Sequence, residues 1–137
     1  MQSNKTLLTS SVLIVDDDIE ALEEMADALQ DYGLVVYTAS NENMALEQAL
    51  EHRPEFIIMD YLLRGSTGTD VVKAIHKSIP ETQVIMISGF EDLCRVVTTT
   101  NSGVIAVLKK PLSIDSIGSF INNRLEQKNR KSKVAIK

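Results

Sequence analysis

The chain has 137 residues, of which 44% are hydrophobic and 24% charged, with a formal net charge of −5. This length suits one domain with one core, and the apolar fraction is too high for a disordered chain. No apolar run approaches the roughly 20 residues that cross a bilayer, and the single cysteine excludes an internal disulfide. We therefore expect a cytoplasmic protein that has no membrane partner.

In chain order, short apolar runs alternate with amphipathic stretches of helical spacing. The alternation predicts strand Val12–Val15, helix around Leu22–Leu29, strand Leu34–Tyr37, helix around Ala45–Leu50, strand Phe56–Met59, helix around Val71–Ile75, strand Val84–Ile87, helix around Asp92–Asn101, strand Val104–Leu108 and helix Ile114–Leu125. The runs are rich in Val and Ile, which is typical of strands buried on both faces. The fourth helix is predicted to be the weakest and most mobile element, because Val96–Thr100 are five consecutive β-branched residues.

This repeated strand–helix pattern predicts an α/β fold. Parallel strands joined by right-handed helical crossovers form a three-layer sandwich, here a five-stranded parallel sheet flanked by five helices.

Charge is divided unevenly between the two parts of the chain. Residues 1–60 hold 13 acidic and 2 basic side chains, whereas residues 61–137 hold 6 acidic and 12 basic ones. The net acidic balance argues against direct nucleic-acid binding. Several of the basic residues lie between Arg124 and Lys137, where we expect a solvated helix end and a basic tail or linker.

Reactive side chains follow four of the five predicted strands. They are Asp16, Asp17 and Asp18 after the first strand, Asp60 after the third, Ser88 after the fourth, and Lys109 and Lys110 after the fifth. Because ligands of open parallel sheets bind beyond the carboxyl ends of the strands, we expect these side chains to converge there. Taken singly, each is an ordinary turn residue, helix cap or solvent-exposed lysine, so only their combination indicates a site.

The combination indicates chemistry on a phosphoryl group. Grouped carboxylates repel each other unless a cation lies between them, and Mg²⁺ prefers carboxylate oxygens. The Ser88 hydroxyl and the Lys110 ammonium can then hold an anion against the metal. A carboxylate in such a site can serve as the covalent acceptor.

Four motifs, VLIVDDD, IIMDYLLRGSTG, VIMISG and VLKKPL, occur in this order and resemble the receiver domain of two-component response regulators. The resemblance covers residues 11–126, which leaves 1–10 as an N-terminal extension and 127–137 as a basic C-terminal tail or linker. It implies the flavodoxin-like receiver fold with strand order 2-1-3-4-5. It also implies that Asp60 accepts a phosphoryl group from a sensor histidine kinase or phosphotransfer protein.

The resemblance further implies a ligand set for Mg²⁺ or Mn²⁺. Asp17 would bind the metal directly and Asp16 would bind it through water. The Asp60 carboxylate and the Leu62 backbone carbonyl would complete the protein ligands.

The remaining roles implied by the resemblance fall on Ser88 and Lys110, which would contact the phosphoryl oxygens. Lys110 is preferred to Lys109 because it directly precedes Pro111, across an expected cis peptide bond. One position departs from the family pattern. Val107 stands three residues before Lys110, where the family usually has Tyr or Phe, so switching cannot use an aromatic ring there.

Two other classes of protein share parts of this sequence pattern with receiver domains. A haloacid-dehalogenase-type phosphatase also uses an aspartate nucleophile, but Glu20 occupies the place of its Thr or Val, and no acidic pair follows Lys110. A flavodoxin-like cofactor domain is disfavoured because the acidic first loop would repel the flavin phosphate.

A third alternative is a receiver that binds partners without being phosphorylated. We predict a signalling domain that catalyses only its own phosphorylation and dephosphorylation. Such a domain is not an enzyme with independent substrate turnover. We expect its partner to be a downstream output protein or an effector domain outside these residues, and homodimer formation is left open.

Overall fold

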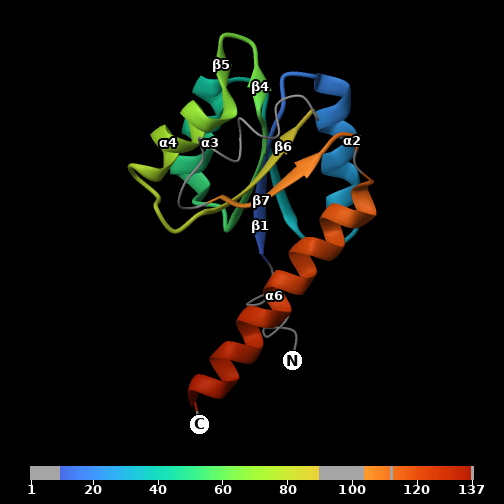
Figure 1. Cartoon of the computed structure of the whole chain (residues 1–137), viewed down its shortest axis with the longest axis vertical. Coiled ribbons are helices and arrows are strands. Elements are labelled where there is room, and N and C mark those ends of the chain that lie inside the picture. Colours follow the sequence, from blue (N-terminus) through green and yellow to red (C-terminus); the bar gives the residue numbers. More distant parts are fainter. Residues whose placement is uncertain (1–9, 90–103, 112, 137) are drawn as a thin grey trace.

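The computed structural model describes residues 10–89, 104–111 and 113–136, with residues 128–136 as backbone alone. Five parallel strands form one sheet in the order β2-β1-β3-β6-β7, which is the predicted order 2-1-3-4-5 counted along these strands (Figure 1). Their bounds are β1 Ser11–Val15, β2 Val35–Ala39, β3 Phe56–Asp60, β6 Gln83–Ser88 and β7 Val104–Lys109.

Helices cover both faces of this sheet and make the predicted three-layer sandwich (Figure 1). Their bounds are α2 Ile19–Gln30, α3 Glu42–His52, α4 Gly68–His76 and α6 Ile114–Ile136. Four of the five predicted helices therefore lie in the described part of the chain. The predicted helix Asp92–Asn101 lies outside the described residues.

Each of the three shorter helices begins at a side chain that caps its free backbone N–H groups. Asp18 accepts a hydrogen bond from Ala21 in α2, and Asn41 accepts one from Met44 in α3. Thr67 does the same for α4. Such caps satisfy donors that have no partner inside the helix, so they set where each helix begins.

The apolar core is divided by the sheet into two clusters. On one face, Leu13, Ile57 and Met86 pack with residues of α3 and α4. On the other face, Ile14 and Ile85 pack with residues of α2 and α6. Alternate residues of one strand point to opposite faces, so the central strands must be apolar at every position.

The prediction that all five strands are buried on both faces is confirmed for β1, β3 and β6 only. It is wrong for the edge strands: Val35 of β2 is 42% exposed, and no residue of β7 is fully buried. The reason is positional, since an edge strand has a neighbour on one side alone. A run of Val and Ile does not reveal where a strand lies in the sheet.

A short antiparallel hairpin, β4 (Leu62–Leu63) with β5 (Ser66–Thr67), follows directly after β3 and was not predicted. Gly65 in its turn has a φ of 82°, in the left-handed region that favours glycine. This hairpin carries the chain from the end of β3 to the start of α4, beside the reactive strand ends.

The last helix extends beyond its predicted length. Helix α6 begins after Ser113, as predicted, but continues to Ile136 instead of ending near Leu125. It therefore runs through most of the segment 127–137 that we assigned as a tail or linker. Figure 1 shows its second half projecting away from the sheet.

Near its start, α6 is fastened to the end of α2. The Tyr32 hydroxyl donates a hydrogen bond to Asp115 Oδ1 (2.8 Å). The Tyr32 ring lies over Gly118, where an added Cβ would overlap the ring atoms. A larger residue at position 118 would force the Tyr32 ring to shift from its place against α6.

Candidate functional site

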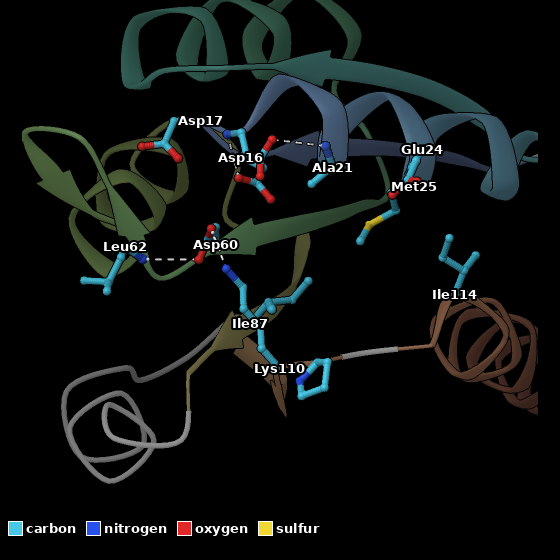
Figure 2. Close-up of a pocket in the computed structure, with 12 residues that line it drawn as sticks. Asp16, Asp17, Ala21, Glu24, Met25, Asp60, Leu62, Ile87, Lys110 and Ile114 are labelled. Atoms are coloured by element: carbon cyan, nitrogen blue, oxygen red, sulfur yellow. Dashed lines mark hydrogen bonds and ion pairs between the residues drawn. The ribbon is translucent and has the colours of Figure 1, made fainter.

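The predicted carboxylates and Lys110 converge at the carboxyl edge of the sheet. Asp16 and Asp17 follow β1, Asp60 ends β3 and Lys110 follows β7, and all four line one pocket of about 760 Å³ (Figure 2). Leu62 of β4 lines the same pocket. The predicted cis peptide bond between Lys110 and Pro111 is also found.

Three carboxylates form the acidic part of this pocket. Asp16, Asp17 and Asp60 each offer an oxygen within 4.8 Å of the others, a spacing that a single cation can bridge. Asp60 is only 6% exposed. Oxygen donors carrying this much negative charge fit a hard divalent cation such as Mg²⁺ better than a softer metal.

Lys110 supplies positive charge at the buried carboxylate. Its Nζ lies 3.0 Å from Asp60 Oδ2, in a charge-assisted hydrogen bond. On the other side of the carboxylate, the Leu62 N–H donates to Asp60 Oδ1 at 3.4 Å (Figure 2). Both oxygens of Asp60 are therefore hydrogen-bonded. The Lys110 ammonium is also close enough to pair with a negatively charged group bound at Asp60.

Asp17 is held by the hairpin, a contact that the sequence did not predict. The backbone N–H of Arg64 donates to Asp17 Oδ2 (2.9 Å), and the Arg64 Nε lies 3.9 Å from the same oxygen. The Arg64 side chain is 92% exposed, so the backbone hydrogen bond is the stronger of the two contacts. The signal that was missed is the tight turn at Arg64-Gly65, which brings a backbone N–H over the first loop.

Ser88 is at the predicted strand end, but its hydroxyl is not among the pocket-lining groups. The residue is 1% exposed, and its Oγ donates to the carbonyl of Gly89 (2.9 Å). Its own carbonyl accepts from the backbone N–H of Lys110 (2.9 Å). Ser88 therefore lies beside the site, and a rotation about its Cα–Cβ bond is needed before the hydroxyl can serve a ligand.

Burial raises the pKa of Asp16 above its ordinary value, and the negative charges of Asp60 and Asp17 raise it further. Two effects oppose this rise: the Asp18 N–H donates to Asp16 Oδ1 (2.9 Å), and Lys110 lies nearby. The net upward direction means that a proton, or another cation, is favoured at this cluster when the protein is folded.

We expect Asp16→Asn to stabilise the metal-free protein at neutral pH. The raised pKa means that the folded state binds the Asp16 proton more tightly than the unfolded chain does. Asp16 therefore does not lower the free energy of unfolding below about pH 4, the ordinary pKa range of an Asp carboxyl. As pH rises through the raised pKa, the charged Asp16 increasingly destabilises the folded state. Asparagine carries no such penalty and can still accept from Asp18. Thermal unfolding in EDTA at pH 7.5 should show a rise in Tm of roughly 2–4 °C.

The control for this substitution is Asp70→Asn, which removes one negative charge from an exposed first-turn position of α4. Acids in the first turn are favourable, so this variant should show no gain in Tm. The gain from Asp16→Asn should also shrink as the pH is lowered toward 4. An unchanged or lower Tm for Asp16→Asn in EDTA at pH 7.5 would contradict the electrostatic strain inferred here.

The other half of the pocket is mainly apolar and was not predicted. It lies between α2 and α6, and its lining residues are Ala21, Glu24, Met25, Ile87, Pro111 and Ile114. Strand ends could reveal the polar half, but this half depends on how two helices from opposite ends of the chain pack.

No helix in the described ranges is long and apolar enough to cross a bilayer.

With this geometry established, comparison with known proteins gives a consistent result. The family model described as "Response regulator receiver domain" matches residues 12–122. Among curated proteins, the acid tolerance regulatory protein ActR of Rhizobium meliloti is 30% identical over 107 residues, which are 78% of this chain and 55% of ActR. The nitrogen assimilation regulatory protein NtrX of Azorhizobium caulinodans is 30% identical over 121 residues, which are 87% of this chain and 27% of NtrX.

Solved structures agree with the sequence matches. A CheY-like response regulator receiver domain protein from Methanospirillum hungatei has a TM-score of 0.81 and 25% identity, covering 90% of this chain and 98% of that one. NtrX from Brucella abortus also has a TM-score of 0.81, with 28% identity over 93% of this chain and 29% of that one. The chain thus spans about half, or less, of the curated regulators named above.

Proposed function

The chain belongs to the response regulator receiver domain family, and we propose that it takes a phosphoryl group onto Asp60 from a sensor histidine kinase or phosphotransfer protein. The observation that carries this proposal is the position of Asp60. Its carboxylate is buried at the end of a central strand, contacts Lys110 at 3.0 Å, and faces two further carboxylates. A buried acid in such surroundings is costly unless it serves a site.

In the proposed reaction, one Asp60 oxygen attacks the phosphorus atom of the donor. A bond forms between that oxygen and phosphorus, while the bond from phosphorus to the donor breaks and its electron pair leaves with the donor. Lys110 then pairs with a phosphoryl oxygen in place of Asp60 Oδ2. Ser88 leaves the Gly89 carbonyl and donates to a second phosphoryl oxygen.

Mg²⁺, or Mn²⁺, fits the donor set of the acidic cluster, and Asp16, Asp17 and Asp60 are the carboxylates that would hold it. We propose the Leu62 backbone carbonyl as a further ligand. When bound, the cation neutralises charge on the carboxylates and the phosphoryl oxygens. The chain's own backbone positions these carboxylates: the Leu62 N–H donates to the acceptor Asp60, and the Arg64 N–H donates to Asp17.

We propose that this protein is a switch with no independent substrate turnover, since the acceptor that it modifies is its own Asp60. Phosphorylation changes how it binds a downstream output protein or an effector domain. The sequence relatives are named as regulatory proteins and are longer than this chain, which supports an output beyond the receiver. Val107 lies where a switching aromatic ring is common, so the signal must leave the site by another route.

Metal-dependent labelling tests this function. Incubation with acetyl phosphate and Mg²⁺ should produce a phosphorylated band on a phosphate-affinity gel, and EDTA should abolish it. The Asp17→Asn variant should need about ten times more Mg²⁺ for half-maximal labelling, because one carboxylate ligand is lost. Asp27→Asn removes the same charge from an exposed position on α2 and should leave the Mg²⁺ requirement unchanged.

Labelling that is equally strong in EDTA would contradict a metal-assisted reaction. Failure to label with any small phosphodonor or kinase would favour the alternative of a receiver that binds partners without phosphorylation.

A further inference from the structure

We propose that the apolar half of the pocket binds the alkyl chain of small acyl phosphates, so that this protein prefers donors with a longer neutral chain over acetyl phosphate. The inference rests on the proposed function and adds a specificity to it. It assigns a role to Met25 and Ile114, which no step of phosphoryl transfer requires.

The pocket is larger than the transferred group needs. Its volume is about 760 Å³, whereas a water molecule occupies about 30 Å³ in the liquid, and a phosphoryl group with a hydrated cation fills only a fraction of it. The acidic cluster and Lys110 account for one side. Figure 2 shows Met25 from α2 and Ile114 from α6 lining the other side, beside the space around Asp60.

The walls of this second side suit a short aliphatic chain. Met25 and Ile114 are only partly buried, so each presents apolar surface to a ligand. Ile87 and Pro111 also line this pocket and add apolar surface to it. Glu24 is the charged residue among the lining groups of this half, and it would repel a chain that ends in a carboxylate. The donor class is therefore an acyl phosphate with a neutral alkyl chain.

The spacing of the two helices that form this side is set by direct contacts. Tyr32 follows α2 and binds Asp115 in the first turn of α6, with its ring against Gly118. Because these contacts hold α2 and α6 together without a ligand, the apolar side is already formed when the donor arrives, which lowers the entropic cost of binding.

The reaction on such a donor balances without any further reactant. Asp60 attacks phosphorus, the new Asp60 oxygen–phosphorus bond forms, and the bond between phosphorus and the acyl oxygen breaks. The electron pair leaves with the acyl oxygen as a carboxylate, and no net proton transfer is needed. The alkyl chain stays in the apolar half while the acyl group departs.

The test compares butyryl phosphate with acetyl phosphate in the presence of Mg²⁺. Two additional methylene groups in partial contact with apolar walls should raise the second-order rate constant of Asp60 phosphorylation about fivefold. The Met25→Gln variant keeps an unbranched side chain of similar length that is equally suited to a helix, but makes the wall polar. In it, the butyryl-to-acetyl ratio should fall below two.

Met44→Gln is the matched control, since it makes the same change at an exposed position of α3, on the opposite face of the sheet. It should keep the fivefold ratio. Ile114→Thr provides a second test of the wall, because it shortens the side chain and replaces apolar surface with a hydroxyl, and it should also lower the ratio. The ratio within one protein cancels any partial unfolding of that variant. Comparison of the ratios between variants cancels the difference in intrinsic reactivity between the two donors.

The outcomes separate this inference from the function on which it rests. Labelling of Asp60 by both donors at equal rates, or an unchanged ratio in Met25→Gln and Ile114→Thr, would overturn the apolar subsite and leave the receiver function intact. Absence of labelling by either donor would overturn the proposed function, and the subsite with it.

Discussion

Replacement of Asp60 by asparagine should abolish phosphoryl labelling, with a loss of at least about a hundredfold relative to the unchanged protein. The amide is not nucleophilic toward phosphorus, and no other described carboxylate both contacts Lys110 and lies at the end of a central strand. The measurement is phosphate-affinity electrophoresis after incubation with acetyl phosphate and Mg²⁺, with intact-mass analysis to count the phosphoryl groups added.

The fold should survive this substitution, because asparagine keeps an oxygen that can accept from the Leu62 N–H. Asp70→Asn removes the same charge at an exposed position of α4 and should label normally. Normal labelling of Asp60→Asn would show that the acceptor lies elsewhere, with Asp16 and Asp17 as the next residues to test.

The largest loss of stability is expected for Gly68→Ala, at about 2–3 kcal/mol. Gly68 begins α4 next to the backbone of Asp60, and its N–H donates to the Tyr61 carbonyl (2.6 Å). A Cβ there would lie 2.6 Å from the Asp60 carbonyl oxygen, and 2.9 Å and 3.0 Å from the side chains of Met59 and Met86. The first of these neighbours is a backbone atom at the end of β3. The steric clash can therefore be relieved only if β3 or α4 moves.

Urea unfolding of Gly68→Ala measures this loss directly. Gly89→Ala is the matched control at the end of β6, because nothing lies within 4 Å of the Cβ that it adds. Its free energy of unfolding should change by no more than about 0.5 kcal/mol. Equal free energies of unfolding for the two variants would mean that the start of α4 can move away from the added Cβ at little cost. In that case the helix would not be the rigid support for Asp60 that its packing indicates.

Much of the fold could be predicted from the sequence because the central strands of a doubly covered sheet are apolar at every position. Phe56–Met59 is such a strand, and the structure confirms both its location and its burial. The hairpin of β4 and β5 could not be predicted, since strands of two residues show no periodicity. The exposure of β2 was missed because the composition of a strand does not report how many neighbours it has.

Part of the candidate site could likewise be predicted from the sequence and part could not. Asp16, Asp17, Asp60 and Lys110 were found because each follows an apolar run, and strand ends in a parallel sheet share one edge. The orientation of the Ser88 hydroxyl toward Gly89 depends on a single side-chain torsion, about which the sequence carries no information. The Arg64 backbone contact to Asp17 and the apolar wall of Met25 and Ile114 arise from packing between distant segments.

The length of helix α6 means that a small tilt at its start would become a larger displacement at its far end. Its 23 residues correspond to a rod of about 35 Å, at 1.5 Å per residue, and its first residue follows soon after Lys110-Pro111, which line the pocket. A tilt of about 5° at Ile114 would displace the far end, near Ile136, by about 3 Å, as follows from the helix length. Such a displacement is comparable to the spacing of hydrogen-bonded atoms, so a change too small to disturb the core could make or break contacts at the distal end.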